Sequence, residues 1–205
     1  YEFANKVFVQ KKGTPIGVSL SCSVARLCCN SFDREMKSLL ETNKIKMNAV
    51  CRYLDDERRI TRALAPGFRW NKERRELQFR KKWEAEDREV SAAERTGRVL
   101  NDMRNSIYPD MQWTYETQEM FEDGTLPSLD ARLWVQDNKL VVYAFYSKEV
   151  ANKHVIHKDS ALGENMKIAS LVQNMIRRMK NTSELVDMKI RLAIVDEFAK
   201  QLMMS

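Results

Sequence analysis

Apolar residues recur with two different spacings in this 205-residue chain, one typical of strands and one typical of helices. These spacings constrain its fold more than any other feature. In residues 129–135, "LDARLWV", every second residue is apolar, as in a half-buried strand. In residues 185–202 apolar residues recur at steps of three and four, which aligns them on one face of a helix. Strands and helices must therefore pack together, and the expected fold class is α+β.

The same patterns predict the order of the elements. Strands are expected over 1–10, over 43–54, and as a hairpin over 129–135 and 139–146. Helices are expected over 19–40, over most of the charged stretch 57–107, over 168–179 and over 185–202. Pro66-Gly67 interrupts the charged stretch, and Pro109 ends it. The apolar stripe of 185–202 is expected to lie in the core.

Positive charge is concentrated in one short segment. The chain has a net charge of +6, and residues 67–82, "GFRWNKERRELQFRKK", hold seven Lys or Arg and two Glu, a net charge of +5. Phe68, Trp70 and Phe79 are interleaved with these cations. Such a mixture suits contacts with nucleic acid, although a solvated helix face with a few buried aromatics fits the pattern equally well. The cations that would contact a nucleic-acid backbone are Arg69, Lys72, Arg74, Arg75, Arg80, Lys81 and Lys82.

The cysteines and the length of the apolar runs bear on where in the cell the protein is located. Cys22, Cys28, Cys29 and Cys51 show no metal-ligand spacing, so they are expected to be reduced thiols in the core of an intracellular protein, nuclear or cytoplasmic. No apolar run reaches the roughly 18 residues that a membrane-spanning helix needs. A membrane partner is therefore not expected.

Two adjacent aspartates follow the second expected strand. In "AVCRYLDDERRI", residues 49–60, an apolar run ends at Tyr53-Leu54 and Asp55-Asp56 follow. A tight turn can hold two carboxylates at an exposed edge, where Mg²⁺ takes few carboxylates together with phosphate oxygens. An acidic turn at the start of a solvated stretch is the simpler alternative.

A glycine-containing loop precedes the first expected helix. In "QKKGTPIG", residues 10–17, Gly13 and Gly17 allow the backbone to approach a ligand closely. The start of the following helix would favour phosphate. The loop is not a P-loop, because the Gly-Lys-Ser/Thr ending is absent, and a plain strand-loop-helix connection is the alternative.

Taken together, the loop, the helix and the Y-L-D-D turn resemble the palm of reverse transcriptases. The glycine loop corresponds to motif B and the turn to motif C of that family. Residues 126–148, "LPSLDARLWVQDNKLVVYAFYSK", resemble the segment around the primer grip in retroelement enzymes, nearest to the Penelope-like type, and residues 160–185 resemble the helical start of the thumb.

The resemblance implies a role for individual residues. Asp55 and Asp56 would be catalytic residues and ligands of Mg²⁺, the implied cofactor. The surface for nucleotide and template would include Gln10, Gly13, Pro15, Gly17 and Tyr53. A primer-grip-like segment would include Leu126, Pro127, Leu129 and Asp130.

The resemblance also implies four segments and an activity. A partial palm would span 1–66, a charged helical insertion 67–110, the palm end and hairpin 111–146, and a helical thumb-like segment 147–205. The parent enzyme would be an RNA-directed DNA polymerase that uses an RNA template, a DNA primer and deoxynucleoside triphosphates.

Two departures from the family pattern bear on activity. The strand that carries the family's first catalytic aspartate, motif A, is absent from this chain, so the chain is expected to be inactive alone. Glu57-Arg58-Arg59 follow the turn where relatives have apolar residues, so the return strand is expected to be short, exposed or shifted. The alternative functions are a non-catalytic nucleic-acid-binding domain and a protein-interaction domain, either one derived from a retroelement.

Overall fold

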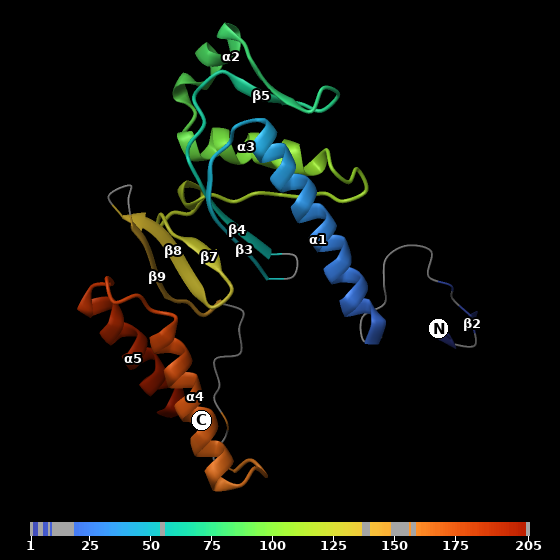
Figure 1. Ribbon diagram of the computed structural model, residues 1–205. Coiled ribbons are helices and arrows are strands. Elements are labelled where there is room, and N and C mark those ends of the chain that lie inside the picture. Colours follow the sequence, from blue (N-terminus) through green and yellow to red (C-terminus); the bar gives the residue numbers. More distant parts are fainter. Residues whose placement is uncertain are drawn as a thin grey trace. The chain divides into compact units, whose positions relative to one another are not determined.

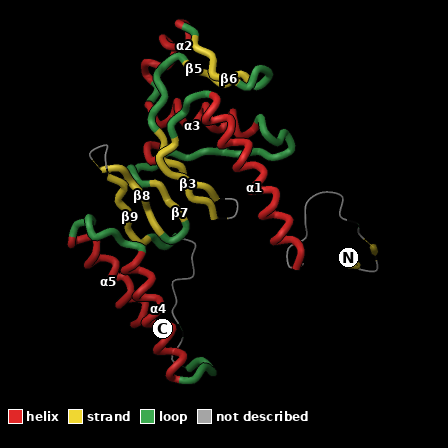
Figure 2. The backbone as a smooth tube through the Cα atoms, viewed as in Figure 1, coloured by secondary structure: helices red, strands yellow, loops and turns green. Residues whose placement is uncertain are grey.

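The computed structural model of the chain forms two compact units, Tyr1–Tyr115 and Glu116–Ser205. It describes residues 2–3, 6–7, 9, 19–53, 56–136, 140–148, 156 and 159–203. Both units combine helices with small antiparallel sheets, as Figures 1 and 2 show. The expected α+β fold class is therefore confirmed.

The first unit is built on a long helix, α1 (Ser19–Thr42). Its second half is buried through Phe32, Met36 and Leu39, whereas Leu20 and Leu27 in its first half are more than 60% exposed. The helix ends in a Schellman motif, in which the Ile45 amide donates to the Leu40 carbonyl and Lys44 takes a φ of +55°. The chain thereby turns sharply into the next strand.

The expectation of core cysteines is wrong. Cys22 and Cys28 lie on the exposed part of α1, Cys51 is exposed on a strand, and Cys29 is half-buried. All four are free thiols, as expected. The helical spacing was interpreted correctly, but the N-terminal part of α1 has no covering element among the described residues.

Three two-stranded hairpins belong to this unit. β1 (Glu2–Phe3) pairs with β2 (Lys6–Val7), β3 (Met47–Tyr53) with β4 (Asp56–Thr61), and β5 (Phe68–Asn71) with β6 (Glu76–Phe79). The expected helix over 57–107 is therefore wrong for 57–79. Across β5 and β6 the apolar residues pair as Phe68↔Phe79 and Trp70↔Leu77, a period-two pattern that the many charges obscured.

Helices follow in the second half of the charged stretch, as expected. α2 (Lys81–Glu86) and a 3₁₀ turn, η1 (Asp87–Glu89), lead to α3 (Ala92–Asn105). The hydroxyl of Ser91 accepts a hydrogen bond from the Glu94 amide and caps the start of α3. Leu100, Met103 and the following Ile107 recur at steps of three and four and are all buried.

The core of the first unit joins α1 to α3. Its buried members are Phe32, Met36, Leu39, Leu40, Ile45, Leu100, Met103 and Ile107, with Met47, Leu64, Trp70, Leu77, Tyr108 and Trp113 packed against them. The side-chain amide and carbonyl of Asn43 extend this core, since they bond the Arg75 carbonyl and the Leu77 amide. The β5–β6 hairpin is thus fixed to the end of α1.

The second unit contains a three-stranded meander. After a 3₁₀ turn, η2 (Gln118–Met120), come β7 (Leu126–Ser128), β8 (Ala131–Gln136) and β9 (Leu140–Phe145), in the order β7-β8-β9. The expected hairpin over 129–146 is confirmed, with β7 as an additional strand.

Two helices complete the second unit. α4 (Glu164–Lys180) and α5 (Met188–Met203) follow the sheet in the chain. A small core in this unit consists of Val142, Ala144, Val186 and Ile194. The segment between the helices is bonded to β9, because the Ser183 amide donates to the Tyr143 carbonyl at 2.7 Å. The four segments expected from the sequence are thus regrouped: the hairpin and the C-terminal helices share one unit.

The expected core stripe of α5 is wrong. Leu185, Met188 and Leu192 are each more than half exposed, and the face that α5 buries carries Ile194, Phe198 and Gln201 instead. A helix with two apolar faces can bury either one, and periodicity does not say which. Within the described residues, no helix is both long and apolar enough to cross a membrane.

Candidate functional site

The Y-L-D-D segment forms the turn of a β-hairpin. β3 ends at Tyr53, β4 begins at Asp56, and these two residues are paired across the strands. Leu54 and Asp55 lie between them and outside the described residues, and Tyr53 and Asp56 are described by their backbone alone. The register brings Tyr53 and Asp56 opposite each other, so the connection between the two strands is two residues long.

Of the remaining residues assigned to nucleotide and template, none can be placed. Gln10, Gly13, Pro15 and Gly17 lie outside the described residues. Their expected roles stay predictions.

A buried cluster of charges lies directly next to the turn. Glu57, the second residue of β4, has a side chain with 0% exposure, and its carboxylate forms ion pairs with Arg52, Arg59 and Arg104. Arg52 also donates from Nε to Asp33 Oδ2 at 3.1 Å. We call Asp33, Arg52, Glu57, Arg59 and Arg104 the Glu57 cluster. It joins β3 and β4 to α1 and α3.

The Glu57 cluster bears on the return strand, which was expected to be short, exposed or shifted. β4 is six residues long, its register against β3 shifts between Met47 and Ala49, and Ile60 is 40% exposed, whereas the side chain of Glu57 is fully buried. The reasoning considered a buried strand with isolated charges, which would be unstable. Here the charges are paired with one another: Arg52 and Arg59 belong to the same hairpin as Glu57, whereas Asp33 and Arg104 come from α1 and α3.

Aromatic rings cover the guanidinium groups of this cluster. The Arg104 guanidinium lies 4.2 Å from the centre of the Trp113 ring, and that of Arg52 lies 5.4 Å from the Phe32 ring. Trp113 and Phe32 stack on each other with centroids 4.9 Å apart. Cation–π contacts thus replace part of the hydration that the arginines lose on burial.

The cluster carries more positive than negative charge. Burial, together with the neighbouring Arg104 and Arg52, lowers the pKa of Arg59 to about 9. Burial likewise lowers the pKa of Arg104 to about 10, with Arg52 as the second cause. Three guanidinium groups share two carboxylates, so the surroundings of the turn are electropositive.

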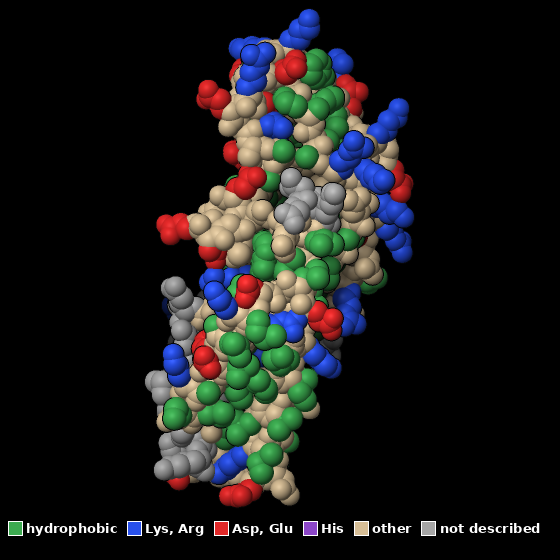
Figure 3. Space-filling model, turned by 90° about the vertical axis from the view of Figure 1, so that its left-hand side faces the viewer, with side chains coloured by type: hydrophobic (Ala, Val, Ile, Leu, Met, Phe, Trp, Pro, Cys, Tyr) green, Lys and Arg blue, Asp and Glu red, His purple; other side chains and the backbone are tan. Residues whose placement is uncertain are grey.

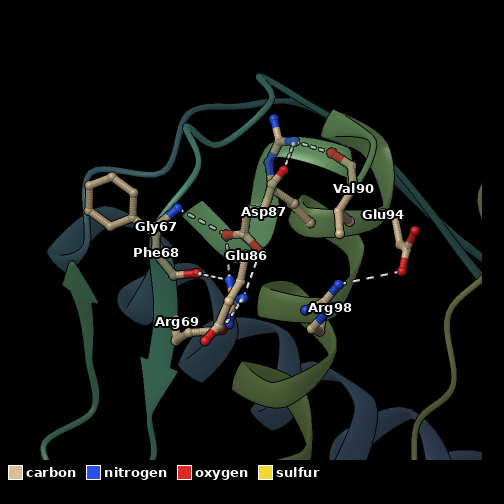
Figure 4. A network of polar contacts seen from close by, with 9 residues as sticks. Gly67, Phe68, Arg69, Glu86, Asp87, Val90, Glu94 and Arg98 are labelled. Carbon is tan, nitrogen blue, oxygen red and sulfur yellow. Dashed lines mark hydrogen bonds and ion pairs between the residues drawn. The ribbon is translucent and has the colours of Figure 1, made fainter. Parts of the chain in front are cut away.

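A second buried charge organises the basic stretch. Asp87 is 1% exposed, and both of its carboxylate oxygens accept hydrogen bonds at 2.6 Å from the guanidinium of Arg69 (Figure 4). The Gly67 amide donates to the same carboxylate at 2.9 Å. The hydrogen bond from Arg69 is the main reason why the pKa of Asp87 falls to about 2.

The structure therefore separates the seven cations predicted to contact nucleic acid. Arg69 is committed to Asp87, Arg75 pairs with Glu35 of α1, and Arg74 lies 3.8 Å from Glu76. Arg69 uses Nη1 and Nη2 to bond Asp87, and its expected contact with nucleic acid stays a prediction. Lys72, Lys81 and Lys82 are exposed, and exposed Arg80 lies over the Trp83 ring at 4.7 Å.

The primer-grip-like residues lie in the second unit. Leu126 and Pro127 belong to β7, and Leu129 and Asp130 form the turn into β8. Leu129 is 46% exposed and takes a φ of +52°, a conformation that is uncommon for residues other than glycine. Asp130 is bonded to Arg177 of α4, Nε to Oδ2 at 2.6 Å, and this bond raises the pKa of Arg177.

The donor set at the turn fits a partial magnesium site. Two adjacent carboxylates supply the hard oxygen ligands that Mg²⁺ prefers, and water and phosphate oxygens complete its shell in nucleotide enzymes. Among the described residues, no group of three or more His, Cys, Asp or Glu is arranged to hold a metal. The resemblance assigns the ion to Asp55 and Asp56, and because the side chains of both lie outside the described part of the chain, this role stays a prediction.

Sequence reasoning missed Glu57 and Asp87 as buried residues. Both stand in charged stretches, where an exposed position is the usual one. A signal was present for Asp87, since Gly67 and the apolar alternation after it indicate a β-hairpin. A hairpin of two strands needs contacts with another part of the chain, and Asp87 provides one. For Glu57 the nearby Arg52 and Arg59 are visible in the sequence, but Arg104, which lies 47 positions further along the chain, is not.

No known protein family, curated protein or solved structure matches this chain.

Proposed function

We propose that this chain is part of a reverse-transcriptase-type polymerase in which the turn after β3 binds Mg²⁺ and nucleotide phosphates. The observation that carries the proposal is the β3–β4 hairpin, whose register pairs Tyr53 with Asp56 and leaves two residues at the tip. In this proposal Asp55 from the connection and Asp56 from the first position of β4 supply carboxylate oxygens to the ion. The parent reaction is the attack of a primer 3′-hydroxyl on a deoxynucleoside triphosphate, with pyrophosphate as the leaving group.

Each part of the chain has a defined task in this proposal. Asp55 and Asp56 hold the ion, which when bound stabilises charge on the transferring phosphoryl group. The Glu57 cluster holds β4 against β3, α1 and α3, so the turn is carried on a rigid base. Its surplus of guanidinium charge favours an approaching polyphosphate.

Metal binding at the turn can be tested by paramagnetic relaxation with Mn²⁺ as the probe. We expect Mn²⁺ to broaden the amide signals of residues around 52–57 selectively. The double variant Asp55→Asn/Asp56→Asn removes this effect, whereas Glu73→Gln, which changes an exposed carboxylate, leaves it intact. Uniform broadening at many acidic residues, unchanged in the double variant, contradicts the proposal.

The second candidate function is nucleic-acid binding without chemistry. It is favoured by the exposed cations of the β5–β6 hairpin and α2, which are Lys72, Arg80, Lys81 and Lys82, and by the partly exposed ring of Trp83, over which Arg80 lies. Phosphate contacts through four cations give a slope of about −3 to −4 in a plot of log K against log salt for duplex DNA. Glutamine at Lys81 and Lys82 reduces the slope by about 2, and alanine at Arg69 unfolds the hairpin instead.

A further inference from the structure

α5 exposes an apolar seam that its own unit does not use. The seam comprises Met188, Leu192, Val195, Ala199 and Leu202. Met188 is 64% exposed, Leu192 is 55% exposed and Leu202 is 40% exposed, whereas Val195 is half-buried and Ala199 is exposed. Large apolar side chains gathered in one exposed row on a helix mark an interaction surface.

The seam is distinct from the face with which α5 packs inside the second unit. That inner face carries Ile194, Phe198 and Gln201, all less than 10% exposed, and Gln201 accepts a hydrogen bond from the buried Arg178 at 2.5 Å. Figure 3 shows apolar side chains gathered on one face in the lower half of the view, where Figure 1 has α4 and α5. The fold of the unit is thus complete without the seam.

The spacing of the seam is that of a coiled coil. Its residues follow one another at steps of four, three, four and three, and Leu185, just before the helix, extends the row by one more step of three. Apolar residues with this alternation face a second helix in a coiled coil. The seam therefore fits one long apolar helix as its partner.

We propose that the α5 seam binds the α5 seam of a second copy of this chain in antiparallel orientation. When the two-fold axis of the pair passes between Ala193 and Ile194, Leu192 faces the second copy's Val195. In the same register Met188 faces the second copy's Ala199. The longest side chain of the seam thus meets the shortest. A parallel pair stacks Ala199 on Ala199 and leaves a gap, which costs stability, and it also aligns the two helix dipoles.

Charges beside the seam complement each other in the same register. Lys189 and Asp196 are both exposed and lie on the same side of the seam. In the antiparallel pair Lys189 of each copy comes within reach of the second copy's Asp196, which forms two equivalent ion pairs across the two-fold axis. The surface is therefore self-complementary in shape and in charge.

The proposal is tested by sedimentation velocity on the 205-residue chain between about 1 µM and about 1 mM, a range suited to the weak association of a two-heptad seam. We expect a concentration-dependent dimer, and Leu192→Asp should raise its Kd at least about tenfold. Ile190→Asp is the matched control, since Ile190 is 41% exposed on the same helix but off the seam, and it should change the Kd less than about threefold.

Several outcomes overturn the proposal. A wild-type chain that stays monomeric throughout, or a dimer that Leu192→Asp and Ile190→Asp weaken equally, contradicts it. So does a loss of the circular dichroism signal in Leu192→Asp, because the seam would then be packed within the chain itself.

A charge exchange tests the antiparallel orientation. Lys189→Glu and Asp196→Lys should each weaken the dimer, and the double variant should restore the wild-type Kd within about threefold. A double variant weaker than either single variant contradicts the antiparallel register, since Lys189 and Asp196 would then have other partners. The result does not depend on the proposed polymerase function, because none of these residues belongs to the metal turn.

Discussion

The guanidinium of Arg69 binds both carboxylate oxygens of Asp87 at 2.6 Å, and this pair fixes the basic hairpin to the 3₁₀ turn η1 between α2 and α3. Asp87 also accepts a hydrogen bond from the Gly67 amide. One carboxylate therefore bonds both the Arg69 side chain on β5 and the backbone just before that strand. The stretch with the highest charge in the sequence is therefore folded around a buried ion pair.

Removal of this carboxylate should destabilise the chain strongly. We expect Asp87→Asn to lower the free energy of unfolding by about 2–4 kcal/mol, because it leaves Arg69 without its partner charge. Glu86→Gln is the control: Glu86 lies 4.0 Å from the same guanidinium and its side chain is 50% exposed, so the loss should stay below about 1 kcal/mol. Urea unfolding followed by tryptophan fluorescence measures both, and equal losses contradict the account.

The same pair makes stability depend on pH in a defined range. The pKa of Asp87 is lowered from 3.8 to about 2 in the folded chain, chiefly by the bond from Arg69. Its stabilising contribution is therefore fully present above pH 3.8 and is lost as the pH falls toward 2. The difference in unfolding free energy between the native chain and Asp87→Asn should shrink over this interval. A difference that stays constant from pH 5 to pH 2 rules this out.

Gly97 in the middle of α3 lies against the ring of Tyr115. A Cβ at this position would come within 2.5 Å of Tyr115 Cδ2, so Gly97→Ala should destabilise the chain by about 1–2 kcal/mol despite the better helix propensity of alanine. In a Tyr115→Ala background the same change should be stabilising, by up to about 1 kcal/mol, because only the propensity term remains. Chemical denaturation of the four variants gives both values, and the absence of this sign reversal would show that the ring is not the obstacle.

Glu57 is the central carboxylate of its cluster, and its loss should affect the turn. Glu57→Gln leaves Arg52, Arg59 and Arg104 with Asp33 as their remaining carboxylate, and we expect a loss of about 3–5 kcal/mol. Glu73→Gln changes an exposed residue and should alter the unfolding free energy by less than about 0.5 kcal/mol. Hydrogen exchange of the β3–β4 amides should accelerate in Glu57→Gln alone. Unchanged protection there contradicts the role given to the cluster.

The sequence predicts elements whose apolar residues have one strong period. The stripe of α3 and the alternation in β8 and β9 identify these elements, and the strand that runs into Asp55-Asp56 is found as β3. Residues 68–79 were misread, because Phe68, Trp70, Leu77 and Phe79 keep the period of two while the charges between them suggest a solvated helix. In this segment the charged composition suggested a helix, whereas the spacing of the apolar residues correctly indicates two strands.

Burial depends on partners that the local sequence does not contain. The stripe of α5 is amphipathic, but Phe198 and Ile194 form a competing face, and contact with β9 decides which face is covered. Glu57 and Asp87 are buried because arginines from other elements reach them. For the candidate site, the sequence predicts the turn but not the charged cluster next to it.

The central claim is that the turn after β3 takes Mg²⁺ together with nucleotide phosphates, and titration calorimetry tests it most directly. Mg²⁺ should bind the 205-residue chain at least about tenfold more tightly with a deoxynucleoside triphosphate than without one, after correction for binding of the ion to free nucleotide, because phosphate oxygens complete its coordination shell. In Asp55→Asn/Asp56→Asn this coupling should vanish. The same coupling in the native chain and in the double variant would contradict the claim.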